Sequence, residues 1–164
     1  MNKVFKEYSL YYDLLYKDKD YEKESEYIHS LICEFNRALH SKRILNLGCG
    51  TGQHDISLSK FDYQIDGVDF STSMLELANK NLNKFPNLRN KISFLKGDVR
   101  TVFTNQSYGI VLSLFHVMSY QTSNEDFISS LNTVKKHLEL GGIFIFDCWY
   151  GPAVLTIKPT IRYK

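Results

Sequence analysis

The sequence predicts an α/β fold, in which a doubly wound and mostly parallel sheet carries helices on both faces. Short apolar runs alternate along the chain with amphipathic segments of helical spacing. The apolar runs are rich in Ile, Val and Leu, as is typical of strands that are buried on both faces. Helices between such strands imply right-handed crossovers in one parallel sheet. The chain has 164 residues, which is enough for a single domain with one core.

The elements can be assigned in chain order. Residues 1–40 form an N-terminal cap and a helix, because apolar residues from Tyr21 to His40 recur at helical spacing. Residues 41–148 form the core. The apolar runs place its strands at about 43–48, 63–69, 91–96, 108–115 and 143–148.

Serine residues mark the starts of two helices within the core. Ser71 is expected to cap a helix whose apolar residues share one face. Ser123, with an acid three residues later at Asp126, indicates a capping-box variant at the start of a second helix. We expect this second helix to run through Leu138 and to end at Gly141 and Gly142. A helix is also expected from Gln53 to Lys60.

The last segment, 149–164, is too short to supply two more strands and a helix. The strand at 143–148 should therefore lie at the edge of the sheet, although it is apolar on both faces. An exposed apolar edge invites pairing with another chain. We expect that the chain is an N-terminal part of a protein roughly half as long again. The alternative is that a second copy covers this edge in a homodimer.

Composition excludes several classes of protein. A net charge of +2 is too small to argue for binding to nucleic acid or to an acidic membrane surface. No apolar run is long enough to cross a bilayer, and the charged start has no signal-peptide pattern. Cys33, Cys49 and Cys148 form no C-x-x-C pair and are interpreted as reduced thiols of a cytoplasmic protein, with no metal site.

The most informative stretch is Ile44 to Gly52, an apolar strand that leads into glycines at 48, 50 and 52. Glycines at alternate positions let the backbone approach a ligand closely, and the amides at the start of the next helix face the same ligand. Asp69, at the end of the second strand, is placed to accept hydrogen bonds from ribose hydroxyls. These features predict a nucleoside-bearing cofactor at the carboxyl edge of the sheet.

The glycine spacing is G-x-G-x-G, whereas dinucleotide-binding folds use G-x-G-x-x-G to approach a pyrophosphate. No Lys or Arg lies between Gly48 and Gln53 to assist a phosphate, so a nicotinamide-dependent oxidoreductase is disfavoured. The stretch instead resembles the first motif, (D/E)-x-G-x-G-x-G, of the class I S-adenosylmethionine-dependent methyltransferases. Asn46 stands where that family has its acid, which predicts a weaker grip on the cofactor's ammonium group.

Four later segments resemble further motifs of this family, in the family's order. They are Asp69-Phe70-Ser71-Thr72-Ser73-Met74-Leu75, Gly97-Asp98-Val99, the strand from Tyr108 to Phe115, and Leu138-Glu139-Leu140-Gly141-Gly142 before the fifth strand. The resemblance implies a Rossmann-like sheet of order 3-2-1-4-5-7-6, of which strands 1–5 are visible and strands 6 and 7 are missing. The residues that it assigns to S-adenosylmethionine are Asn46, Gly48, Cys49, Gly50, Gly52, Asp69, Phe70, Met74, Asp98, Val99 and Ser113.

The segment Tyr12-Asp13-Leu14-Leu15-Tyr16 resembles the start of the small-molecule methyltransferases that N-methylate nucleotide-linked amino sugars. The resemblance implies that Tyr12 or Tyr16 lines the site. The alternative is a tyrosine-rich helix that only covers the sheet. The expected reaction is therefore methyl transfer to a small molecule, with the amino group of such a sugar as the leading acceptor.

The acceptor should lie beyond the fourth strand. There His116 could take a proton from an ammonium acceptor, and Tyr120 lies nearby in the sequence. Trp149 and Tyr150 could wall the acceptor pocket; alternatively, His116 is structural and the two aromatic residues cover the sheet edge. No N-P-P-Y tetrapeptide of nucleic-acid methyltransferases stands at the fourth strand. The remaining alternative is a truncated, non-catalytic module that binds the cofactor weakly or pairs through its edge.

Overall fold

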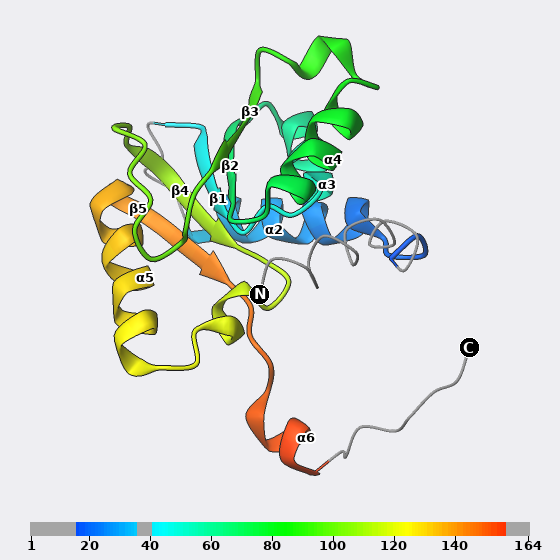
Figure 1. Ribbon diagram of the computed structural model, residues 1–164. Helices are drawn as coiled ribbons and strands as arrows, with labels where there is room; N and C mark the ends of the chain where they lie inside the picture. The colour runs from blue at the N-terminus through cyan, green and yellow to red at the C-terminus, as the bar shows by residue number, and fades with distance from the viewer. Residues whose placement is uncertain (1–15, 36–40, 157–164) are drawn as a thin grey trace.

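The computed structural model describes residues 16–35 and 41–156, and it confirms the α/β class. Its five strands form one parallel sheet of order β3-β2-β1-β4-β5 (Figure 1). The strands are β1 (Arg43–Leu47), β2 (Gln64–Asp69), β3 (Ile92–Lys96), β4 (Tyr108–Ser113) and β5 (Leu138–Phe146). This is the order that the methyltransferase resemblance implies for strands 1–5.

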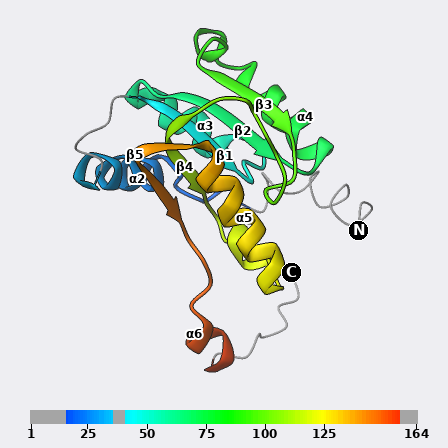
Figure 2. The same cartoon turned by 90° about the vertical axis from the view of Figure 1, so that its left-hand side faces the viewer.

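Helices cover both faces of the sheet (Figures 1 and 2). They are α2 (Tyr21–Phe35), α3 (Gln53–Leu58), α4 (Thr72–Leu82), α5 (Asn124–His137) and α6 (Gly151–Thr156), with short 3₁₀ turns η1 (Ser59–Phe61), η2 (Pro86–Leu88) and η3 (Val117–Tyr120). On one face, Ile28 of α2 and Leu58 of α3 pack against Ile44 of β1. On the other, Val134 of α5 packs with Leu45. Ile44 and Leu45 are both buried but belong to opposite faces, because successive side chains of a strand point to opposite faces.

Both predicted serine caps are confirmed. The hydroxyl of Ser71 accepts a hydrogen bond from the Met74 amide, and that of Ser123 accepts one from the Asp126 amide. The second half of the predicted capping box is wrong, because the Asp126 carboxylate contacts Arg100 at 2.9 Å instead. A guanidinium is a stronger partner for a carboxylate than a backbone amide is.

The predicted end of α5 is also wrong. The helix ends at His137, and β5 already begins at Leu138, which has an extended backbone. Tyr108 pairs with Leu138 but Ile110 pairs with Ile143, so β5 contains a bulge opposite β4. Gly141 lies in the left-handed region, and a Cβ on Gly142 would lie 2.8 Å from the Gly109 carbonyl oxygen. The glycines therefore form the bulge between the strands.

Within the described part of the chain, β5 is an edge strand, as expected. Its apolar side chains are incompletely covered: Leu140 is fully exposed and Phe146 is 41% exposed. Beyond this edge, α6 projects away from the sheet in both views (Figures 1 and 2). Across residues 16–35 and 41–156, no helix combines the length and apolar character that crossing a membrane requires.

Candidate cofactor and acceptor site

The candidate site lies at the carboxyl edge of the two central strands. β1 and β4 are neighbours, but the chain leaves β1 toward β2 and leaves β4 toward β5. In open α/β sheets, ligands bind outside the carboxyl ends of the strands at such a switch point. The glycine loop follows β1, and His116 follows β4. The topology therefore places both predicted halves of the site together.

The three loop glycines all have left-handed backbones, with φ of +83° at Gly48, +57° at Gly50 and +73° at Gly52. A Cβ on Gly48 would lie 2.4 Å from the Val117 side chain, and one on Gly52 would lie 2.5 Å from Phe94. A Cβ on Gly50 would meet nothing within 4 Å. Packing thus requires two of the glycines, whereas Gly50 faces open space that a ligand can use.

Asp69 joins the end of β2 to this loop. One carboxylate oxygen accepts a hydrogen bond from the Gly50 amide and the other from the Ser71 amide, both at 2.8 Å. Burial raises the pKa of Asp69, and the two backbone hydrogen bonds oppose that rise. Each carboxylate oxygen can accept a further hydrogen bond. The contact with ribose stays a prediction that this geometry permits.

Asn46 has an acidic partner that sequence reasoning missed. Its amide nitrogen donates to a carboxylate oxygen of Asp55 at 2.7 Å, and both side chains are buried. Burial raises the pKa of Asp55 to about 7; the hydrogen bond from Asn46 opposes this rise, and the nearby charge of Asp69 contributes to it. The loop therefore has an acid after all, supplied by α3. The sequence offered one signal, which is that Asp55 is the only acid in the helix after Gly52.

Other predicted cofactor residues differ in their accessibility. Phe70 is 61% exposed, which excludes the core position and leaves its ring free to cover a ligand. Cys49 and Met74 are buried, and burial raises the pKa of the Cys49 thiol. Ser113 is buried and donates to the Leu47 carbonyl at 3.1 Å, so its hydroxyl ties β4 to β1. Val99 packs beside the core. Their contacts with a cofactor remain predictions.

Asp98, which the family resemblance assigns to the cofactor and there to the adenine amino group, is engaged within the protein. Its carboxylate contacts the guanidinium of Arg100 at 2.6 Å and 2.9 Å, and Arg100 in turn contacts Asp126. The hydrogen bond from Arg100 lowers the pKa of Asp98. An adenine amino group would therefore share this carboxylate with Arg100.

On the acceptor side, His116 is held by a carboxylate that the sequence analysis did not select. Its backbone amide donates to the two oxygens of Asp147 at 3.1 and 3.2 Å, and Nδ1 lies 3.2 Å from Oδ2. Phe115 and His116 both have left-handed backbones, with φ of +63° and +65°. Two consecutive non-glycine residues of this kind store strain that persists where the surroundings fix it, often at functional sites.

Aromatic rings surround His116. The Tyr16 ring meets Phe115 edge-on with centroids 4.9 Å apart, and the Trp149 ring lies 5.9 Å from that of His116. The structure thus brings Tyr16, His116 and Trp149 together. Tyr120 and Tyr150 are 69% and 73% exposed, and no described contact joins them to His116. Tyr12 lies outside the described residues, so its predicted role is untested.

A chain of charges anchors the Tyr16 segment to the helix after the glycine loop. Lys19 contacts Glu24 at 2.7 Å, and Glu24 contacts His54 of α3 at 2.8 Å. The hydrogen bond from His54, followed by that from Lys19, lowers the pKa of Glu24 to about 2. The Lys19 ammonium also lies 4.0 Å above the Phe115 ring. His54, which had no predicted role, therefore positions the N-terminal segment.

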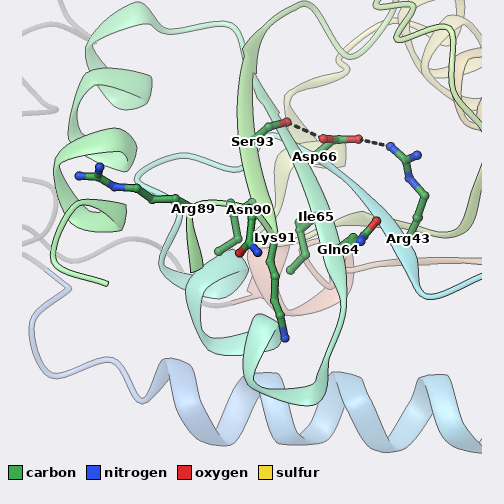
Figure 3. A pocket seen from close by; sticks show the side chains of 9 residues that line it. Arg43, Gln64, Ile65, Asp66, Arg89, Asn90, Lys91 and Ser93 are labelled. Atoms are coloured by element: carbon green, nitrogen blue, oxygen red, sulfur yellow. Dashed lines mark hydrogen bonds and ion pairs between the residues drawn. The ribbon is translucent and has the colours of Figure 1, made fainter. Parts of the chain in front are cut away.

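A hollow of about 180 Å³ lies elsewhere, at the amino ends of the strands (Figure 3). Its charged groups have partners within the chain: Arg43 pairs with Asp66, and Lys91 with Asp62. It therefore offers little to an anionic ligand, and it is remote from the glycine loop. Among the described residues, no cluster of His, Cys, Asp and Glu could hold a metal ion.

Comparison with known proteins adds a family match. The family described as "Methyltransferase domain" matches residues 44–142. A dTDP-3-amino-3,4,6-trideoxy-α-D-glucopyranose N,N-dimethyltransferase of Streptomyces venezuelae is 29% identical over 143 residues, or 86% of this chain and 56% of the relative. The chain thus spans about half the length of the curated relatives that it matches.

Two solved structures share the fold at 27% sequence identity. DesVI of Streptomyces venezuelae superposes with a TM-score of 0.76, over 87% of this chain and 58% of that one. An S-adenosylmethionine-dependent methyltransferase of Clostridium acetobutylicum superposes with a TM-score of 0.77, over 99% of this chain and 65% of that one. The architecture that positions the candidate site is therefore shared with these proteins.

Proposed function

The chain belongs to the methyltransferase-domain family, and on this premise we propose that it transfers the methyl group of S-adenosylmethionine to an amino group of a small molecule. A nucleotide-linked amino sugar is the leading acceptor. The curated relatives named as N,N-dimethyltransferases of dTDP-linked amino sugars support that class. The observation that carries the proposal is the glycine loop bound to the Asp69 carboxylate, beside a histidine held by Asp147.

The residues around the loop fit this cofactor better than a dinucleotide. Gly50 leaves open space for a ligand, and Phe70 offers an exposed ring. The Asp69 carboxylate suits ribose hydroxyls, since it can accept hydrogen bonds beyond the two that it already has. Asp55 and Asp69 place two buried carboxyl groups around the loop; a cationic ligand would stabilise their ionised forms, whereas a pyrophosphate would be repelled by them.

S-adenosylmethionine supplies a methyl group already activated on a sulfonium, so the protein's task is mainly to align the acceptor and exclude water. An amino group that enters as an ammonium must first lose a proton. The Nδ1 atom of His116 lies 3.2 Å from Asp147 Oδ2 without a hydrogen bond to any described residue, so the imidazole can take that proton while the nearby carboxylate stabilises the resulting charge. The amine's lone pair then forms the N–C bond while the C–S bond breaks, and the electron pair remains on sulfur. Tyr16 and Trp149 wall the acceptor beside His116.

The test is a methyl-transfer assay with labelled S-adenosylmethionine and the full chain. A dTDP-linked amino sugar is compared with the matched sugar that carries a hydroxyl in place of the amine. We expect a methylated amine and no methylated hydroxyl sugar. His116→Gln should lower the rate about 100-fold near neutral pH, the lower range for a positioned base. The loss should shrink in alkaline buffer, where the amine is already neutral. A folded chain that binds the cofactor but methylates only the hydroxyl sugar would overturn the proposed acceptor.

We propose a small-molecule acceptor and not nucleic acid, because the net charge is only +2. The free thiols of Cys33, Cys49 and Cys148 support a cytoplasmic location.

The exposed Leu140 and Phe146 on β5 favour one second candidate role, pairing of two copies through this edge. Sedimentation equilibrium tests it: a dimer that Phe146→Lys dissociates supports edge pairing, and a monomer at all concentrations rejects it.

A further inference from the structure

We propose that Asp55 supplies the negative charge that selects the cationic amino-acid end of S-adenosylmethionine at the glycine loop, acting through its contact with Asn46. The inference deepens the proposed function and rests on it. Asp55 is a positioning residue here, because its side chain is fully buried and does not touch the ligand space. Its influence is exerted by its charge and by the orientation that it gives to Asn46.

The first observation is an incomplete buried pair. The Asn46 amide nitrogen donates to one Asp55 oxygen at 2.7 Å, but the other Asp55 oxygen and the Asn46 amide oxygen have no hydrogen-bond partner among residues 16–35 and 41–156. No cationic side chain of the described residues forms an ion pair with Asp55 within 4.0 Å. A buried carboxylate with one neutral partner is expensive for a fold. An apolar side chain would serve packing better, so a structural role does not account for Asp55.

The second observation is the surroundings of the pair. Asn46 is the penultimate residue of β1 and lies two residues before Gly48, where the loop begins. Asp55 lies three residues after Gly52, in the first turn of α3, whose Ile56 amide donates to the Gly52 carbonyl. Asp69 faces Asp55 from β2 and raises its pKa, while the charge of Asp55 raises the pKa of the Cys49 thiol inside the loop. From α2, Glu24 approaches this region, but it is engaged by His54. The charged groups facing the loop are therefore negative.

Together these observations describe a loop that lacks its own cation and is backed by a buried acid. A ligand whose positive charge enters this space supplies the missing counter-charge, and it gains from a carboxylate in a medium of low dielectric. A neutral ligand with the same nucleoside gains nothing from Asp55. The pair should thus determine specificity for charge while the nucleoside contacts stay independent of it.

The experiment compares S-adenosylmethionine with 5′-methylthioadenosine, which has the same nucleoside but neither the ammonium nor the sulfonium. Both are titrated calorimetrically into the full-length wild-type chain, Asp55→Asn and the exchanged double variant Asn46→Asp/Asp55→Asn. Asp55→Asn should weaken S-adenosylmethionine on the order of 10–100-fold and change 5′-methylthioadenosine by less than about threefold. The double variant returns one charge to the pair and should restore most of the lost affinity. Circular dichroism confirms that each variant is folded.

Each other outcome overturns the inference in a recognisable way. If Asp55→Asn lowers the affinity for both ligands equally, Asp55 has only a structural role. If the affinity for both is unchanged, the charge of Asp55 does not contribute to binding. If the double variant is folded but still binds S-adenosylmethionine weakly, the charge of the pair does not determine the affinity. If the folded wild-type chain binds neither ligand, the proposed function itself fails. If it binds both with equal affinity, the cofactor site stands and the role of Asp55 falls.

Discussion

Replacing Asp55 by asparagine should stabilise the folded chain in neutral and alkaline buffer and leave it almost unchanged near pH 4. Burial raises the pKa of Asp55 from its ordinary 3.8 to about 7, so the folded chain holds this proton more tightly than the unfolded chain does. The contribution of Asp55 to the free energy of unfolding therefore falls as pH rises from about 4 to about 7, and it is level above that range. The interval between the two values corresponds to roughly 4 kcal/mol. Asparagine keeps the size and an acceptor oxygen for Asn46 but has no proton to lose.

Urea unfolding followed by far-UV circular dichroism at about pH 4, 6 and 8 would measure this. The free energies of wild type and Asp55→Asn should agree at the lowest pH and separate by up to about 4 kcal/mol at the highest, with the variant more stable. Glu76→Gln, which alters an exposed acid on α4, is the matched control and should run parallel to wild type. If the free energy of unfolding of Asp55→Asn changes with pH in the same way as that of wild type, ionisation of the Asp55 carboxylate does not destabilise the fold, and the reasoning is refuted.

Two further predictions concern the cofactor loop. Gly50→Val should abolish binding of S-adenosylmethionine in a chain that still folds, because a side chain there enters open space. Gly52→Val should fail to fold, because its Cβ would lie 2.5 Å from Phe94. Circular dichroism tests folding and calorimetry tests binding, and retained affinity in folded Gly50→Val would remove the loop from the site. Asp69→Ala should weaken binding by roughly 1.5–3 kcal/mol, the range for a hydrogen bond to a charged group. An unchanged dissociation constant would place the ribose contact elsewhere.

Local sequence signals predicted much of this fold. The apolar runs located β1 to β4 to within about two residues, because strands buried on both faces need such runs, whereas the start of β5 was placed too late. Ser71 and Ser123 located two helix starts, because a cap is a contact between residues only three positions apart. The glycines at 48, 50 and 52 likewise located the loop after β1, and their left-handed backbones became known only from the structure. Each of these signals depends on neighbours in the sequence.

Features that depend on distant residues could not be predicted in this way. The pattern continues the helix through Leu138, yet that residue is extended because it pairs with Tyr108 of β4. Asp147 became part of the candidate site because β5 ends beside β4, where its carboxylate meets the His116 amide. The Asp55 carboxylate meets the Asn46 amide because α3 packs against β1. Tertiary contacts override local propensity in the first case and create the polar pairs in the others.

The most direct test of the account is an NMR titration of the isotope-labelled chain with S-adenosylmethionine. The account predicts saturable shifts of the Gly50 and Ser71 amides, which donate to the two oxygens of Asp69, and no shift of Lys91 or Ser93 beside the hollow at the amino ends of the strands. Shifts at Lys91 and Ser93 with the Gly50 and Ser71 amides unmoved would contradict it, as would a folded chain with no shifts at all.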